Sequence, residues 1–446
     1  MPKELFGTDG IRGVPGTAPL DDATLCRTGA ALGHFLLERE ARPRVLIGMD
    51  TRESGPHIAQ RIAAGLAEAG ATATSAGVLT TPGVAYLVHA KGFSAGVVVS
   101  ASHNPYHDNG VKLFASTGMK FPDEVEEQLE REILRASGPG GHTRADLHVD
   151  RSLGAEYLDF LRSRTIPGAH LEGLKLALDC ANGAASTLGA ELFRSLGAEV
   201  IAIHDHPNGR NINSDCGSLH PEALRRTVLE SRANLGVAFD GDADRAIFVS
   251  STGHIVSGDG VLLAAARYLK SAGQLKGSRV IGTSMANLGL EVALTAEGIA
   301  LERVPVGDRY VLEEMLASGC NLGGEQSGHV IFLDDATTGD GLLTAVKMAC
   351  LVALRGPLDD LVRGLKIFPQ TIVNVMVRSK PPLESLPEFS RALEKAEQTL
   401  GDRGRIVVRY SGTEPKARVM VEAEREEEVA RWSEALAAII RSAIGA

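Results

Sequence analysis

One structural plan recurs three times along this chain: an apolar strand, an amphipathic helix, a glycine-bearing turn, a second strand, a second helix, and a strand that opens into a polar loop. The copies cover residues 44–102, 174–240 and 279–329. A repeat of this length is too long for a solenoid. Alternating strands and helices form parallel sheets, whose ligand sites lie beyond the carboxyl ends of the strands. We therefore expect three similar α/β domains with mostly parallel mixed sheets, and polar loops that meet in one cleft.

The pattern changes after Pro369. A strand (371–377), a helix (386–400), two further strands (405–409 and 417–422) and a final helix from Arg425 indicate a smaller α+β domain. A chain of 446 residues exceeds what one hydrophobic core usually serves. We predict four domains, which cover residues 1–152, 153–253, 254–368 and 369–446.

Composition excludes several classes of function. The net charge of −10 and the absence of a long Lys/Arg run argue against general nucleic-acid binding. The sequence has neither the apolar start of a signal peptide nor a run of about 20 apolar residues that could span a membrane. The cysteines are odd in number, widely spread and never in C-x-x-C, which argues against a disulfide framework or a zinc site and favours the reducing cytoplasm. They are Cys26, Cys180, Cys216, Cys320 and Cys350.

Three carboxylates follow the apolar strand 235–239. Asp240, Asp242 and Asp244 alternate, so in extended backbone they project to one side and can converge on a hard cation. Arg245 and Ser251 stand where a calcium-binding EF-hand loop needs Gly and Glu, which excludes that motif. The alternative is a set of acidic residues that cap a turn, but like charges this close repel without a counter-ion. The adjacent Arg245 can offset the negative charge that remains beside a divalent cation.

A hydroxyl and an imidazole, Ser102 and His103, follow the apolar strand 95–99. A serine that carries phosphate and a metal held by carboxylates are together what phosphoryl transfer requires. Ser100 is a rival nucleophile two residues earlier, and Lys112 can stabilise transferred charge. A plain polar turn is the alternative, because Ser, His, Asn and Pro are common turn residues.

Other polar loops offer groups that bind phosphate or sugar. In the loop 409–416, Ser411 and Thr413 supply hydroxyls, and Gly412 allows close approach of the backbone. Arg409 and Arg418 add forked donors that suit a phosphate which does not react. A plain polar hairpin is the alternative.

The loop after the third repeat contains Glu325 and Ser327, which can hydrogen-bond sugar hydroxyls, and His329, which can exchange protons near neutral pH. The glycine-rich segment 6–13 lacks the P-loop pattern, and Arg12 is its candidate phosphate contact.

Together these motifs resemble the α-D-phosphohexomutase superfamily, and most closely its bacterial phosphoglucosamine mutase branch. The resemblance covers nearly the whole chain. The superfamily motifs lie at residues 6–13, 100–105, 240–245, 324–329 and 409–415, and softer matches to the branch lie at 211–213, 216–222 and 306–311.

The resemblance implies four domains around a central cleft: a phosphoserine domain, a metal-binding domain, a sugar-binding domain and a phosphate-binding C-terminal domain. It implies that Ser102 is phosphorylated and that one Mg²⁺ binds to a phosphoserine oxygen, Asp240, Asp242 and Asp244. The implied reaction interconverts glucosamine 6-phosphate and glucosamine 1-phosphate through a bisphosphorylated sugar, for UDP-N-acetylglucosamine and cell-wall synthesis. The implied catalytic residues are Arg12, Ser102, His103, Lys112, Arg245 and His329. The implied substrate-binding residues are Asp308, Arg309, Glu325, Ser327, Arg409, Ser411, Gly412, Thr413 and Arg418.

The residues leave alternatives open. A phosphoglucomutase or phosphomannomutase would use the same chemistry on a sugar with a different group at carbon 2. A metal-dependent phosphomonoesterase would pass the phosphoryl group to water, and a sugar-phosphate sensor would catalyse nothing. A hexose bisphosphate or a kinase must first phosphorylate the serine. The resemblance also leaves a homodimer open, whereas we expect no nucleic-acid or membrane partner.

Overall fold

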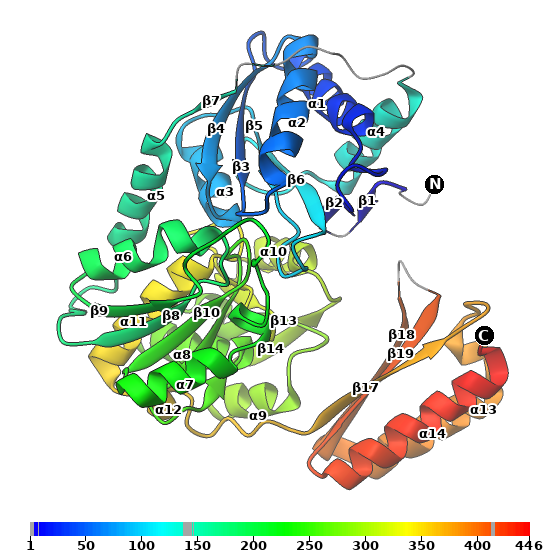
Figure 1. The fold of residues 1–446 in the computed structure, drawn as a ribbon. Coiled ribbons are helices and arrows are strands. Elements are labelled where there is room, and N and C mark those ends of the chain that lie inside the picture. Colours follow the sequence, from blue (N-terminus) through cyan, green and yellow to red (C-terminus); the bar gives the residue numbers. More distant parts are fainter. Residues whose placement is uncertain (1–3, 8, 137–144, 146, 412–414) are drawn as a thin grey trace. The chain divides into compact units, whose positions relative to one another are not determined.

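The computed structural model describes residues 4–7, 9–136, 145, 147–411 and 415–446 (Figure 1). The chain divides into two compact units. One comprises Met1–Thr283 and Val304–Arg363, and the other comprises Ser284–Arg303 and Gly364–Ala446. No helix among the described residues is long and apolar enough to cross a membrane.

The first sheet of the larger unit has the strand order β1-β2-β6-β5-β3-β4-β7. Neighbours from β5 to β7 run parallel, and neighbours from β1 to β5 run antiparallel. Strand β5 consists of Ala, Gly and Val and is buried at every residue, as expected for a strand covered on both faces. The strands are β1 (Phe6–Gly7), β2 (Gly10–Gly13), β3 (Arg44–Met49), β4 (Thr72–Val78), β5 (Ala95–Val99), β6 (Asn109–Ala115) and β7 (His148–Val149).

Helices cover both faces of this sheet. They are α1 (Asp22–Leu37), α2 (Gly55–Ala69), α3 (Thr81–Ala90) and α4 (Asp123–Arg135). Helices α1 and α2 approach closely, because a Cβ on Gly29 would lie 2.1 Å from the carbonyl oxygen of Ile62 and one on Gly65 would lie 1.9 Å from that of Cys26. Helix α3 packs on the other face, where Val84 and Val88 lie over β3 and β5.

The second sheet has the order β12-β11-β10-β8-β9 and is also mixed, with β10 parallel to β8 and antiparallel to β11. Its strands are β8 (Lys175–Asp179), β9 (Glu199–Ile203), β10 (Leu235–Phe239), β11 (Ala246–Ser250) and β12 (Ile255–Val256). The helical segments of this part are α5 (Ser152–Ser163), η1 (Ala184–Thr187), α6 (Gly189–Ser195), η2 (Gly217–Leu219) and α7 (Glu222–Ser231).

In the third sheet, β13 (Arg279–Thr283) pairs in parallel with β15 (Leu322–Gly324), which pairs antiparallel with β16 (Val330–Phe332). The helical segments of this part of the larger unit are α8 (Gly258–Ser271), η3 (Lys276–Ser278), α10 (Asp308–Ser318), α11 (Gly341–Arg355) and α12 (Leu358–Leu361). Buried side chains of β13, α10 and β16 form a core that includes Ile281, Val311, Met315 and Ile331.

The smaller unit contains a three-stranded antiparallel sheet of order β17-β19-β18. Val419 and Val421 of β19 pack with Trp432, Leu436 and Ile440 of the last helix. Its elements are β17 (Gln370–Met376), η4 (Leu383–Ser385), α13 (Pro387–Leu400), η5 (Gly401–Arg403), β18 (Gly404–Tyr410), β19 (Lys416–Ala423) and α14 (Glu426–Ile444). Helix α9 (Leu288–Ala296) and most of β14 (Ala300–Val304) also belong to this unit.

The predicted fold class is confirmed: three mixed α/β sheets and a smaller antiparallel C-terminal sheet are present. The antiparallel share is larger than the repeat predicted, since β6, β11 and β16 each follow a polar loop and return beside the preceding strand. The first helical segment of the second repeat is divided at Leu188 into η1 and α6. The four domain boundaries stay predictions, because the compact units divide the chain differently.

Candidate active site

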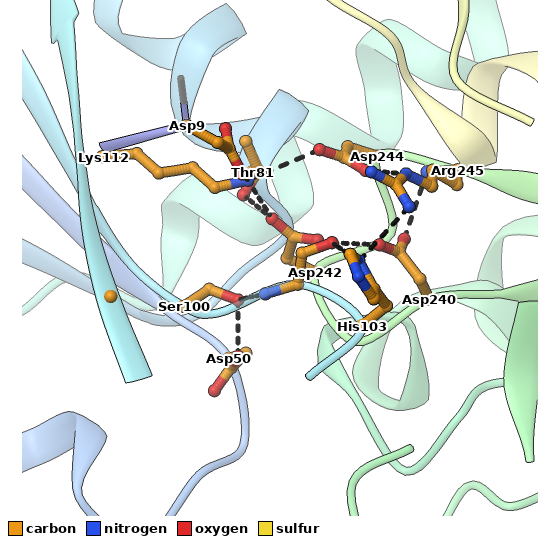
Figure 2. Close-up of polar contacts among 12 residues, drawn as sticks. Asp9, Asp50, Thr81, Ser100, His103, Lys112, Asp240, Asp242, Asp244 and Arg245 are labelled. Atoms are coloured by element: carbon orange, nitrogen blue, oxygen red, sulfur yellow. Dashed lines mark hydrogen bonds and ion pairs between the residues drawn. The ribbon is translucent and has the colours of Figure 1, made fainter. Parts of the chain in front are cut away.

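Ser102 lies in the turn between β5 and β6, where the sequence predicted a nucleophile. Its φ of 52° places it in the left-handed region, which few residues other than glycine adopt without support from their surroundings. The Oγ of Ser102 donates a hydrogen bond of 2.6 Å to Oδ2 of Asp240, and the side chain is buried (Figure 2). The structure therefore brings the hydroxyl of the first motif into contact with the carboxylate cluster of the second.

Ser100, the rival nucleophile, has a different position. Its Oγ donates to Oδ2 of Asp50 at 2.6 Å and accepts the backbone N–H of Ser102 at 2.9 Å (Figure 2). The residue is fully buried. Both the proton and a lone pair of this hydroxyl are engaged away from the carboxylate cluster, so Ser100 supports the turn, and only Ser102 presents its hydroxyl to the aspartates.

Two side chains, those of Arg52 and Asn213, donate hydrogen bonds to carbonyl groups of the Ser102 turn. Arg52 is fully buried, pairs with Asp50 at 2.9 Å, and donates to the carbonyl oxygens of residues 102, 104, 105 and 108. Nδ2 of Asn213 donates to the carbonyl oxygens of Ser102 and Asn104 at 2.8 and 2.9 Å. These donors fix the left-handed turn from two sides, and Asn213 belongs to the part of the chain that also carries the aspartates.

The three aspartates converge, although not by the predicted route. Asp240, Asp242 and Asp244 lie in a turn in which Ala243 has a φ of 56°, whereas alternation in extended backbone was expected. Oxygen atoms of all three carboxylates lie within 4.8 Å of one another. The turn, which β10 and β11 close, brings these side chains together.

The free oxygens of this cluster fit a cation. Oδ2 of Asp242 accepts hydrogen bonds from Thr81 at 2.6 Å and from Lys112 at 2.9 Å (Figure 2). Among the described residues, Oδ1 of Asp242 and Oδ1 of Asp244 are buried and accept no hydrogen bond, although Nδ1 of His329 and Nε of Arg245 lie 3.7 Å from the latter. Buried carboxylate oxygens without partners are costly unless an ion or water binds them, so this donor set suits a hard divalent cation.

Burial and neighbouring charges shift the pKa values of Asp240 and Asp244 in opposite directions. Burial, with the nearby Asp244 and Asp242 carboxylates, raises the pKa of Asp240 well above its ordinary value. Burial would also raise the pKa of Asp244, but Lys112, His329 and Arg245 hold it well below that value. Asp240, which accepts the hydrogen bond of Ser102, therefore binds a proton more strongly than Asp244 does while no cation is bound.

Lys112, on β6, is the central cation of the site. Its Nζ lies 2.9 Å from Asp242, 3.2 Å from Asp9 and 3.5 Å from Asp244, and the side chain is buried. Burial would lower the pKa of this amine, but the three carboxylates raise it well above its ordinary value. Lys112 is therefore a fixed positive charge and a poor proton acceptor.

Arg12 lies beside this cluster, as predicted. It forms an ion pair with Asp9, and Nη1 donates to Oδ1 of Asn104 at 3.3 Å. Asp9 also pairs with Lys120 at 2.7 Å, and Lys120 pairs with Asp308 at the same distance. A chain of alternating charges thus connects the N-terminal strands with the start of α10.

His103 lies next to the nucleophile and is a neutral imidazole. Its Nδ1 lies 3.4 Å from Oγ of Ser102 and accepts a hydrogen bond of 3.2 Å from Arg245. Burial, followed by the positive charges of Arg245 and Arg12, lowers the pKa of His103 to about 4. With Nδ1 accepting from Arg245, the ring proton stands on Nε2.

His329 lies on the opposite side of the aspartate turn. Its Nδ1 is 3.7 Å from Asp244, its Nε2 is 3.9 Å from Asp308, and Nε2 accepts the backbone N–H of Gly339 at 3.0 Å. Burial lowers the pKa of His329, but Asp244 and Asp308 raise it more, and the net direction is upward.

Glu325 and Ser327 lie in the turn between β15 and β16. Glu325 accepts the backbone N–H of Gly307 at 3.2 Å and the hydroxyl of Ser327 at 3.4 Å. Glu325 is half-buried and Ser327 is exposed. Arg309 differs from the other predicted residues, because its described contacts are with the carbonyl of Phe121 and the carboxylates of Asp123 and Glu126.

The predicted phosphate-holding residues belong to the smaller unit. Arg409 on β18 and Arg418 on β19 are direct register partners on neighbouring antiparallel strands. Burial, with the adjacent Arg418 charge, lowers the pKa of Arg409. Two like charges side by side favour an anion between them. Ser411 is buried at the end of β18, and the predicted Gly412 and Thr413 lie outside the described residues.

Several residues of the site were missed by sequence reasoning. Asp9 lies in the glycine-rich segment from which only Arg12 was selected, and Asn213 lies in a segment used only for its resemblance. Thr81, Arg52 and Lys120 carry no local signal. Their side-chain partners are between 50 and 188 residues away, except that Arg52 also pairs with the nearby Asp50. Only the folded chain identifies them.

Comparisons with known proteins identify the family of this chain. Four family models match in succession: phosphoglucomutase/phosphomannomutase domain I at residues 3–138, domain II at 155–253, domain III at 257–367 and the C-terminal domain at 372–439.

Among curated relatives, a phosphoglucosamine mutase from Solibacter usitatus is 52% identical over 447 residues, which cover 100% of both chains. A crystal structure of a phosphoglucomutase/phosphomannomutase family protein from Burkholderia thailandensis is similar with a TM-score of 0.80, 24% identity, and coverage of 98% of this chain and 97% of that one. The structure of Aspergillus fumigatus N-acetylphosphoglucosamine mutase in complex with GlcNAc-6P and magnesium is similar with a TM-score of 0.63, 16% identity, and coverage of 99% and 96%. The chain belongs to the phosphoglucomutase/phosphomannomutase family.

Proposed function

We propose that this protein is a phosphoglucosamine mutase, which interconverts glucosamine 6-phosphate and glucosamine 1-phosphate through a phosphoserine at residue 102. The observation that carries the proposal is the 2.6 Å contact of the Ser102 hydroxyl with a buried carboxylate cluster that has two unpartnered oxygens. The full-length relative that is 52% identical has this activity in its name. Residue chemistry and relationship therefore point to the same reaction.

Ser102, Asp240, Asp242 and Asp244 would hold one Mg²⁺. All four donors are hard oxygens, which Mg²⁺ prefers over softer nitrogen and sulfur ligands. When bound, the cation neutralises charge on the phosphoryl group as it moves between oxygens. The relative from Aspergillus fumigatus was crystallised with magnesium, which agrees with this assignment.

The chain's own residues position and neutralise the transferred group. In the first half-reaction, the bond between phosphorus and the serine oxygen breaks, a bond to a sugar oxygen forms, and the sugar hydroxyl loses its proton. In the second, the other phosphate of the bisphosphate returns to the serine: its bond to the sugar oxygen breaks, a bond to the serine oxygen forms, and the sugar oxygen takes up a proton. Lys112 and Arg245 supply fixed positive charge near the serine. The raised pKa of Lys112 makes it a poor base. His329 is the other candidate for the proton transfer; its Nδ1 faces Asp244, and its Nε2 accepts the N–H of Gly339.

Recognition must work for two orientations of one sugar, since the bisphosphate must return its other phosphate. We propose that Glu325, Ser327 and Asp308 bind ring hydroxyls, and that Arg409, Ser411, Gly412, Thr413 and Arg418 hold the phosphate that is not reacting. Arg12 and His103 would contact the reacting phosphate. Arg309 keeps a substrate-binding role only if it leaves its carboxylate partners on α4. The predicted domains 1–152, 153–253, 254–368 and 369–446 would then carry the nucleophile, the metal, the sugar site and the phosphate site.

The test is transfer of labelled phosphate through the protein. Wild-type protein incubated with ³²P-labelled glucose 1,6-bisphosphate is expected to take about one label per chain and to return it to glucosamine phosphate. Ser102→Ala should take none, whereas the matched control Ser100→Ala should still be labelled at residue 102. Labelling of Ser102→Ala would refute the nucleophile. Release of inorganic phosphate without isomerised sugar would indicate a phosphomonoesterase, and faster turnover of glucose or mannose phosphates would indicate the other mutases.

A further inference from the structure

A second cluster of metal-binding side chains lies in the second sheet. Asp179 ends β8, His204 directly follows β9, and Cys216 directly precedes η2. A carboxylate oxygen, an imidazole nitrogen and the sulfur of these residues lie within 4.8 Å of one another. Asp179 and Cys216 are buried, and the His204 side chain is 30% exposed. This donor set of O, N and S differs from the all-oxygen set of the aspartate turn.

The histidine nitrogen gives a second, independent observation. Nδ1 of His204 is buried and lies 3.0 Å from Oδ2 of Asp179, which raises the pKa of His204, although the contact is not a well-aligned hydrogen bond. An imidazole and a carboxylate at this distance pair as ions while the ring is protonated, and a cation that replaces the ring proton would have both as ligands. Because the His204 side chain is 30% exposed, solvent can reach the edge of this cluster.

Surrounding groups orient the donors. Oδ1 of Asp179 accepts the backbone N–H of Ala181 at 2.9 Å, and Oδ2 accepts that of Gly217 at 3.0 Å. The Asn182 side chain and the Asn213 backbone hydrogen-bond Cys216. Such contacts orient metal ligands. Burial and the carboxylates of Asp179 and Asp215 raise the pKa of Cys216 to about 12, so this thiol gives up its proton only when a cation replaces it.

We propose that Asp179, His204 and Cys216 bind one transition-metal cation of the Zn²⁺ class, with a solvent molecule as fourth ligand. Three protein ligands of O, N and S with tetrahedral completion by water are typical of Zn²⁺ and unsuited to Mg²⁺. The thiol loses its proton to solvent on binding. The spacing of the cysteines argued against a zinc site, but that rule concerns cysteine pairs, and these ligands come from three separate segments.

The site is connected with the Ser102 turn. Asn213 lies three residues before Cys216 and donates to the carbonyl oxygens of Ser102 and Asn104. Asn182, three residues after Asp179, accepts the hydroxyl of Thr51 through its carbonyl at 2.5 Å. A cation that ties these segments together would stabilise the loop that holds the nucleophile, so its removal should lower kcat without a matching change in KM.

Cobalt is the probe, because Co²⁺ bound to a thiolate absorbs in the near ultraviolet and in tetrahedral sites also in the visible range. The full chain, freed of metal with a chelator and supplied with excess Mg²⁺, is titrated with Co²⁺. We expect a thiolate band that saturates at about one equivalent and disappears when Zn²⁺ is added. Cys216→Ser should lose the band and His204→Asn should weaken it. The adjacent buried cysteine provides the matched control Cys180→Ala, which should keep it, as should Asp242→Asn in the aspartate turn.

A measurement on the wild type protects the test against variants that fail to fold. Zn²⁺ should raise the thermal unfolding midpoint by a few degrees in the presence of Mg²⁺, since a ligand that binds only the folded state stabilises it. No thiolate band in the wild type, or a band that persists in Cys216→Ser, would overturn the site. A band lost equally in Cys180→Ala would place the metal elsewhere. None of these results depends on whether the protein acts on glucosamine phosphates.

Discussion

Arg52→Met is the most informative single substitution for the architecture of the nucleophile turn. Arg52 has no exposed side-chain surface and binds the Asp50 carboxylate together with four carbonyl groups of residues 102–108. Methionine has a similar length and no charge, so the substitution removes the donors and leaves the space filled. It therefore separates the electrostatic role of this side chain from its packing.

The structure sets the size of the effect. Removing one member of a buried ion pair costs about 3–5 kcal/mol, because the other charge stays buried without its partner. The carbonyls of Ser102 and Asn104 keep the donor Asn213, so loss of the hydrogen bonds that Arg52 donates to them adds only about 1 kcal/mol. We expect destabilisation of about 4–6 kcal/mol. Because misplacement of a reacting group by about 1 Å can cost a factor of ~100, we also expect kcat to fall by about 10- to 100-fold.

The loss should depend on pH. Burial already raises the pKa of Asp50, with Arg52 acting against the rise, so removing Arg52 raises it further. At pH values between the Asp50 pKa of the folded wild type and that of the folded variant, the variant keeps a proton that the wild type has released. Its stability therefore falls relative to the wild type by up to about 1.4 kcal/mol per pH unit as pH rises. The deficit is therefore smaller in acid and larger in base.

The assay is urea unfolding at pH 5.5 and pH 8, followed by far-ultraviolet circular dichroism. Fluorescence is unsuitable, because Trp432 is the only tryptophan and lies in the core of the smaller unit. Asp50→Asn combined with Arg52→Met should recover about 2–3 kcal/mol, since it removes the unpaired charge. Equal deficits at both pH values, or no recovery in the double variant, would refute the assignment of the cost to the buried carboxylate.

Three further substitutions test other parts of the protein. Asp242→Asn should reduce kcat by at least ~100-fold and raise the Mg²⁺ concentration needed for half-maximal activity; an unchanged Mg²⁺ curve would remove Asp242 from the metal site. Arg418→Ala should raise KM by about 10-fold with a smaller change in kcat, as expected for loss of a charge-assisted phosphate contact, and an unchanged KM would contradict that role. Burial raises the pKa of Asp340 to about 6, so wild-type stability should fall by up to about 3 kcal/mol as pH rises from 4 to 6. Asp340→Asn should flatten this part of the pH profile, and an unchanged slope in thermal unfolding would assign it to other groups.

Local patterns were sufficient to predict most elements that carry the site. The strands 95–99 and 235–239 have the predicted bounds, because a buried strand leaves a short apolar run that ends at a polar loop. The conformation of the aspartate turn was not predictable in the same way. Alternation of three Asp residues suggested extended backbone, but the left-handed Ala243 has no signature in the sequence.

Long-range partners were also beyond sequence reasoning. Lys112 was selected for its charge near Ser102, but its contacts with Asp9 and Asp242 depend on how strands from two sheets are placed. Thr81 begins a helix and has the sequence pattern of an ordinary first-turn residue, yet its hydroxyl donates to Asp242 of the aspartate turn. Such roles follow from packing, and a single sequence does not encode packing in any local pattern.

The antiparallel strands that the repeat did not predict explain why these loops can hold chemistry. Each predicted loop joins two strands that are paired with each other: β5 with β6, β10 with β11, β15 with β16, and β18 with β19. A loop closed at both ends by a ladder of hydrogen bonds has lost most of its conformational freedom before any ligand binds. The sheet can therefore support the left-handed backbone of Ser102 and Ala243, which an open loop would relax. Since phosphoryl transfer depends on placing charges that do not move, the return strand after each loop is what makes the predicted residues usable as a site.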